Sequence, residues 1–123
     1  MNKAYSIQGC DITVSDGNRV TFSGILLRTK QLEELEKALR EILELTQSVD
    51  HLILDFVECE ECISMLLKPV LIWVKEVVNR SKSLTLHVGS EDDELLPWHE
   101  TIVDRIEYFN SSQVPVTIEK QEL

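Results

Sequence analysis

The chain has 123 residues, of which 43% are hydrophobic and 28% are charged, and its formal net charge is −10. This length fits one domain whose core needs neither disulfides nor metals. The negative charge argues against binding to nucleic acids or anionic membranes, which both require clustered Lys and Arg. An acidic surface first of all keeps a protein soluble, and attraction of a basic partner is a second interpretation. No apolar run is long enough for insertion into a membrane.

The first part of the chain predicts a hairpin followed by a helix. Apolar and polar residues alternate within Cys10–Leu27, and Asp16–Asn18 supply a turn between the two strands. Gly24 falls inside this alternation, which indicates a bulge or a close approach of two backbones. Thr29–Ser48 repeats leucine and isoleucine at helical spacing, with glutamates near its start, where the helix dipole favours them.

A strand, a loop and a second helix are predicted next. Leu52–Phe56 opens with the apolar run Leu52–Leu54, ends in Asp55 and Phe56, and is continuous rather than alternating, which is typical of a central strand covered on both faces. The acidic segment Val57–Cys62 is expected to be a loop. The following helix begins near Ser64, or near Lys68 if Pro69 takes the first helical position.

The last part of the chain predicts a strand, a helix and a short strand. Leu84–Val88 alternates as a strand, Pro97 opens a helix with an apolar stripe, and Val114–Ile118 forms the final strand. The order is therefore β-β-α-β-α-β-α-β. Strands that alternate with helices after a leading hairpin predict an α/β domain with a mixed sheet and parallel central strands.

Several strings in this order match the pattern of a known family. They are Val20–Gly24 before an amphipathic helix, Leu52–Phe56, Ser64 at the start of an apolar helix nine residues after Asp55, Leu84–Val88 and Leu96–Trp98. On these strings the chain resembles the STAS domain, the fold of bacterial anti-sigma factor antagonists and of the cytoplasmic tails of sulfate transporters. Its end is similar to that of small stand-alone STAS-like bacterial proteins. The resemblance implies a STAS-like domain over residues 11–118, an N-terminal extension over 1–10 and a C-terminal tail over 119–123.

The resemblance also implies a function. In the antagonists, the serine after this strand is phosphorylated by a partner kinase, which is itself the anti-sigma factor. By resemblance, the chain is a non-enzymatic regulatory protein of signal transduction, with Ser64 as phosphorylation candidate and a serine kinase or another signalling protein as partner. The expected partner-binding residues are Asp55, Glu58, Glu60, Glu61, Ile63, Met65, Leu66 and Lys68. The sequence departs from the family pattern at Ile63 and Leu66, which replace an acidic residue and a glycine.

The residues themselves leave two questions open near this serine. Ser64 is either a switch, because a phosphate at a helix start meets free backbone N–H groups, or simply the N-cap of the helix. Met65–Leu67 forms an apolar contact patch if it is exposed and part of the core if it is buried. An alternative function is a small-ligand carrier or sensor. Its cleft would lie beside residues 57–68 and be closed by Phe56, Met65 and Trp98.

Nothing in the sequence predicts an enzyme, a cofactor or a metal site. The CxxC pair Cys59 and Cys62 cannot close a tetrahedral site alone, and the glutamates between the two thiols oppose their ionisation. We therefore expect both to be buried apolar side chains. His51, His87 and His99 are scattered, with His87 on the polar face of a strand. Three cysteines without a signal peptide indicate free thiols and a cytoplasmic setting.

Overall fold

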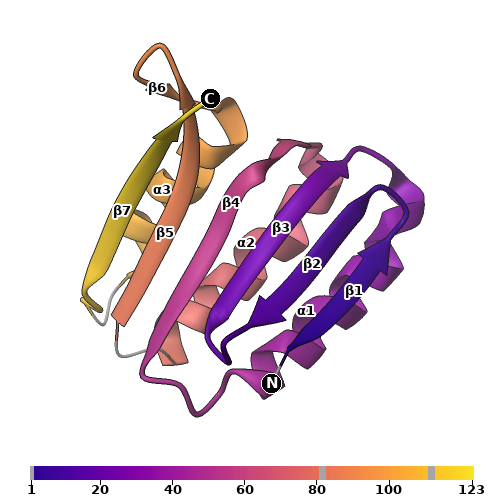
Figure 1. Cartoon of the computed structure of the whole chain (residues 1–123), viewed down its shortest axis with the longest axis horizontal. Helices are drawn as coiled ribbons and strands as arrows, with labels where there is room; N and C mark the ends of the chain where they lie inside the picture. The colour runs from indigo at the N-terminus through magenta and orange to yellow at the C-terminus, as the bar shows by residue number, and fades with distance from the viewer. Residues whose placement is uncertain (1, 81–82, 111–112) are drawn as a thin grey trace.

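The computed structural model describes residues 2–80, 83–110 and 113–123 of the chain. Within these residues, seven strands form one mixed sheet, and three α-helices pack against one of its faces (Figure 1). The predicted α/β class and mixed sheet are confirmed. None of the helices in the described residues is long and apolar enough to cross a membrane.

The sheet and helices include all the segments that the hydrophobic patterns predict, and two further strands. The elements, in chain order, are β1 (Lys3–Ile7), β2 (Cys10–Ser15), β3 (Arg19–Leu26), a 3₁₀ turn (Thr29–Gln31), α1 (Leu32–Leu45), β4 (His51–Cys62), α2 (Ser64–Arg80), β5 (Ser83–Glu91), β6 (Glu94–Leu95), α3 (Pro97–Phe109) and β7 (Val116–Glu122). The two strands missing from the predicted order are β1, which is mostly exposed, and β6, which has two residues. The segment expected as a polar tail instead continues β7.

The strands follow one another across the sheet in the order β1-β2-β3-β4-β5, with β7 and the short β6 both paired to β5. β1, β2 and β3 are antiparallel neighbours, whereas β3, β4, β5 and β7 are parallel. Each parallel pair is joined through a helix, as parallel strands require. The carboxyl ends of these four strands therefore lie at the same edge of the sheet.

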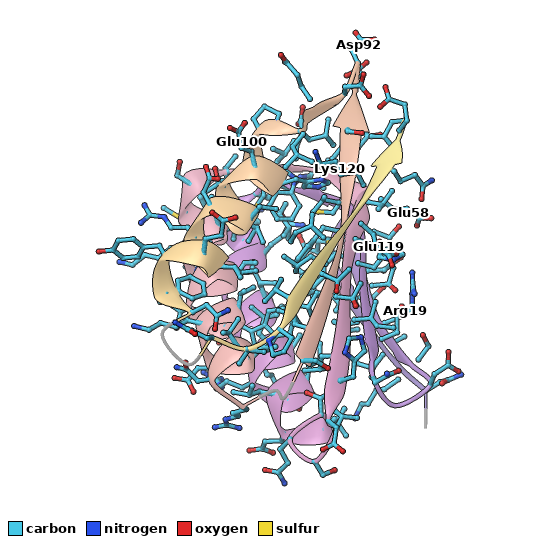
Figure 2. All side chains as sticks on the ribbon, turned by 90° about the vertical axis from the view of Figure 1, so that its left-hand side faces the viewer. Arg19, Glu58, Asp92, Glu100, Glu119 and Lys120 are labelled. Carbon is cyan, nitrogen blue, oxygen red and sulfur yellow. The ribbon has the colours of Figure 1, made fainter. Side chains whose placement is uncertain are left out.

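The three helices cover only one face of the sheet, so the expected coverage of β4 on both faces is wrong. Leu52, Leu54 and Phe56 are buried beneath the helices, whereas Ile53 and Asp55 alternate with them on the other face. Figure 2 shows this sheet nearly edge-on, with side chains on the face opposite the helices. Because Ile53 on that face is also apolar, Leu52–Leu54 forms a continuous apolar run in the sequence.

Aromatic side chains from β3, β4, α2 and α3 meet in the core between sheet and helices. The ring of Phe22 lies 5.0 Å from that of Phe56 and 5.7 Å from that of Trp73, measured between centroids. Phe56 also meets Trp98 at 5.3 Å in an edge-to-face arrangement. Both tryptophans are buried, as their places on the apolar stripes predict.

β4 carries one extra residue relative to β3 at two points. Thr21–Ser23 lies opposite Asp55–Glu58, and Gly24–Ile25 lies opposite Cys59–Glu61. Bulges of this kind bend a strand and increase its twist. Pairing between β4 and β5 stops at Asp55 and His87, and beyond this point the two strands separate (Figure 1). The segment 57–62, expected as a loop, is thus a bulged continuation of β4.

Gly24 lies where two backbones approach each other, as its place in the alternation indicates. Its φ is +109°, and a Cβ atom there would lie 2.1 Å from the carbonyl oxygen of Gly9. The same oxygen accepts a hydrogen bond of 2.9 Å from the N–H of Ile25. No residue with a side chain fits this position without moving the backbone.

Candidate functional site

Ser64 is the first residue of α2 and its side chain is exposed. The N–H groups of Leu66 and Leu67 donate to the carbonyl of Ile63 at 3.0 and 2.8 Å, so Ile63 takes the N-cap place. The Ser64 hydroxyl makes no hydrogen bond to another described residue, and the interpretation of Ser64 as N-cap is wrong. The helix does not start at Lys68, because Pro69 lies inside it.

The residues expected to contact a partner divide by exposure. Glu58, Glu60, Glu61, Met65 and Lys68 are exposed, and Ile63 is half-buried. Met65 exposes 52% of its surface, whereas Leu66 exposes none. Helical geometry turns these consecutive side chains about 100° apart. Leu66 points into the core, so the expectation that it contacts a partner is wrong.

Asp55 belongs to a different part of the molecule from Ser64. It lies on the face of the sheet without helices, where its Oδ2 is 2.6 Å from Nη2 of Arg19 and 4.0 Å from Nδ1 of His87. Nε2 of His87 contacts the carboxylate of Glu119 on β7. This row ties four parallel strands together, and Figure 2 shows Arg19 and Glu119 on that face. Asp55 therefore joins strands and does not form one surface with Ser64.

A cleft of about 620 Å³ opens at the carboxyl edge of the parallel strands. In open α/β sheets, ligands and partners are received at this edge. Its walls come from the ends of β3, β4, β5 and β7 and from the start of α3. The residues that line it are Leu27, Glu60, Glu61, Cys62, Ile63, Glu91, Leu96, Pro97, Trp98 and Leu123. Ile63 precedes Ser64 directly, so the cleft and the exposed serine are neighbours.

The first turn of α3 holds the separated ends of β4 and β5 together. Nε1 of Trp98 and Nε2 of His99 both donate to the carbonyl of Cys59, each at 2.8 Å. Nδ1 of His99 accepts from the N–H of Gly89 on β5 at 2.9 Å. Where β4 and β5 are too far apart to pair, these bonds satisfy the carbonyl of Cys59 and the N–H of Gly89. They also hold the wall of the cleft in place.

His99 is fully buried, and burial lowers the pKa of its imidazole. The two hydrogen bonds require a neutral ring with its proton on Nε2, because Nδ1 acts as an acceptor. Protonation at Nδ1 would place a hydrogen against the N–H of Gly89. His99 is a structural residue of this site that the sequence analysis left unassigned.

Acidification is expected to weaken the fold through His99. Below a pH of about 6.5 the unfolded chain binds a proton that the folded chain excludes, so the free energy of unfolding decreases as the pH is lowered. For one proton the limiting slope is about 1.4 kcal/mol per pH unit. Urea unfolding of the wild type and of His99→Gln across this range measures it. The difference in free energy between the two proteins should shrink as the pH falls, and a constant difference would contradict this role of His99.

The cysteines lie together inside the protein. Cys10 and Cys59 are buried and their thiols share a hydrogen bond, while Cys62 is half-buried. The bond with Cys10 and burial raise the pKa of Cys59, and burial raises that of Cys62 to about 12. Thiolates, which disulfide exchange and metal binding need, are therefore disfavoured at Cys59 and Cys62, whereas the hydrogen bond with Cys59 lowers the pKa of Cys10. The prediction of a buried side chain is confirmed for Cys59, and Cys62 is only partly covered.

Only part of the cleft lining was predictable from the sequence. Glu60, Glu61 and Ile63 were expected at a binding surface and do line the cleft. Of the three residues expected to close a ligand pocket, only Trp98 lines it. Leu27 and Glu91 were missed, although each stands at the carboxyl end of a parallel strand, where this fold class receives ligands.

Within the described residues, no group of three or more His, Cys, Asp or Glu side chains is arranged to hold a metal ion. Comparisons of the chain with protein-family models, with curated proteins and with solved structures find no match. The function proposed below therefore rests on the residues and geometry of the cleft and of Ser64.

Proposed function

We propose that the chain is a non-enzymatic regulatory protein that binds a protein partner at the carboxyl edge of its sheet, in the manner of an anti-sigma factor antagonist of the STAS type. The observation that carries the proposal is the exposed Ser64, which opens α2 one residue after the cleft wall ends at Ile63. Phosphorylation of Ser64 switches the binding. The proposed setting is the cytoplasm of a bacterium, in keeping with three free thiols.

The position of Ser64 suits a phosphate chemically. The first N–H groups of a helix have no partner within it, and the helix dipole favours negative charge there. Lys68 is exposed one turn later, at the spacing that pairs charges along a helix. A phosphate at Ser64 would therefore be held on the surface without disturbing the fold. It would also add nearly two negative charges beside Glu60 and Glu61.

The switch is tested by changing the charge at Ser64. We expect Ser64→Glu to weaken partner binding at least about fivefold, since a partner covering this side chain would have to desolvate the added charge, at a cost greater than the attraction of that charge for a basic group in the neighbouring cleft. Ser64→Ala should bind as the wild type does. The partner is first captured from native cells and identified by mass spectrometry, which also reads the modification of Ser64, and dissociation constants are then measured with purified proteins.

Ser48→Glu is the matched control, because Ser48 is exposed beyond the end of α1, at the opposite edge of the sheet. It adds the same charge and should leave the dissociation constant unchanged. Equal binding by Ser64→Glu and the wild type would overturn the proposed switch. Equal weakening by both glutamate variants would mean that overall charge, and not Ser64, controls the interaction.

The volume of the cleft supports a second candidate, a small-ligand carrier or sensor. Its 620 Å³ is within the range of ligand sites, about 300–1,000 Å³. A ligand that binds only the folded chain raises the temperature of unfolding. Thermal unfolding with lipids, nucleotides and flavins tests this candidate, and no stabilisation by any of them would count against it.

A further inference from the structure

We propose that the cleft binds a basic segment of the partner that carries a large apolar side chain. The inference rests on the proposed function and names the chemistry of the partner at the same edge of the sheet. It is carried by two properties of the cleft, an apolar floor and an acidic rim, which lie together only in the folded chain.

The floor of the cleft is apolar although it is open to solvent. Leu27 and Leu123 expose 38% and 55% of their surfaces, and Ile63 and Leu96 are half-buried beside them. Trp98 is buried behind them with its indole N–H already bonded to Cys59. Covering such a floor with an apolar side chain removes it from water and is favourable.

The rim of the cleft is acidic. Glu60, Glu61 and Glu91 are exposed and line it, and its lining in the described residues includes no Lys, Arg or His. The second bulge of β4 explains this arrangement, because the extra residue brings two consecutive glutamates to one site. Like charges gathered around an apolar floor attract a cationic partner and repel an anionic one.

The same charges decide between possible occupants. A nucleic acid or an acidic peptide would bring further negative charge to three glutamates on a chain whose net charge is −10. A basic segment with a leucine-like side chain is complementary to both rim and floor. Because hydrogen bonds from Trp98 and His99 already hold the wall in place, this wall loses little conformational entropy when the segment binds.

A synthetic peptide of lysine and leucine is a probe for this chemistry. We expect calorimetry to show binding to the full chain, and binding should weaken at least about tenfold when salt is raised from ~0.01 M to ~1 M, because the Debye length falls from about 30 to about 3 Å. A peptide with glutamate in place of lysine should not bind. A peptide with serine in place of leucine should bind at least about tenfold more weakly.

Charge reversal in the chain locates the site. Glu60→Lys combined with Glu61→Lys should weaken binding of the lysine–leucine peptide at least about tenfold. Glu33→Lys combined with Glu34→Lys changes the net charge equally on the exposed face of α1 and should leave binding nearly unchanged. Equal weakening by both double variants, or binding of the glutamate peptide, would overturn the proposal.

The two proposals fail in different ways. If Ser64→Glu weakens binding of the natural partner while Glu60→Lys with Glu61→Lys does not, the regulatory function stands and the basic segment is wrong. If the double variant alone weakens binding, the basic segment stands and the phosphorylation switch is wrong. Circular dichroism of each variant confirms that a loss of binding is not a loss of folding.

Discussion

Replacing Gly24 by alanine is expected to destabilise the protein by about 3 kcal/mol or more, because strained φ and overpacking each cost about 1–3 kcal/mol. The added Cβ atom would lie 2.1 Å from the carbonyl oxygen of Gly9 and 3.1 Å from Cα of Cys10. Both neighbours are backbone atoms of β2 and its entry turn, so neither moves aside as a flexible side chain would. Urea unfolding followed by circular dichroism measures the loss.

Gly17→Ala is the matched control. Gly17 also has a positive φ, +77°, but no atom lies within 4 Å of its Cβ position. Only the backbone strain remains, and the expected loss is about 1 kcal/mol. If the two variants lost equal stability, the close contact of Gly24 with Gly9 would not be the cause.

The second large effect on stability is expected at Leu66 and not at its neighbour Met65, both in the first turn of α2. Leu66→Ala is expected to destabilise the protein by about 2–5 kcal/mol, because its side chain is fully buried and leaves a cavity. Met65→Ala should change stability by no more than about 0.5 kcal/mol, since half of its surface is exposed. Thermal or urea unfolding of both variants measures the contrast.

Partner binding should show the reverse order. Met65→Ala, which keeps the fold, should weaken binding of the partner identified by capture. A conservative Leu66→Met should fold and bind as the wild type does, because it keeps the buried volume. Binding loss by Leu66→Met at full stability would show that Leu66 reaches the partner after all.

Local patterns were sufficient for much of the fold. Alternation and the Asp16–Asn18 turn predict the hairpin of β2 and β3, and leucine spacing predicts α1. Gly24 could be interpreted correctly because an isolated glycine within a strand has few structural uses. Pro97 likewise marks the start of α3, since its ring suits the first helical turn.

The carboxyl half of β4 could not be predicted in the same way. Its two bulges interrupt the alternation, so that Val57 and Cys59 are buried while Glu60 and Glu61 are both exposed. A segment without a regular period looks like a loop in the sequence. The polar row of Asp55 was equally hidden, because its partners lie on three other strands, far away along the chain.

The cleft was only partly predictable for a related reason. Its lining comes from the ends of several strands and from one helix start, and periodicity does not say which of these ends converge. Ser64 was found through a resemblance, and its exposure depends on where the first turn of α2 begins. That start is fixed by the carbonyl of Ile63, which accepts the first helical hydrogen bonds.

Each of the two bulges in β4 reverses which face of the sheet the following side chains point to. Up to Phe56 the even-numbered side chains face the helices. After the first bulge the odd-numbered Val57 and Cys59 face them, and after the second bulge the even-numbered Cys62 does so again. Removing one bulge alone would exchange the inner and outer side chains of everything that follows, up to the start of α2. Single substitutions in this part of β4 therefore disturb the protein far less than the deletion or insertion of one residue does.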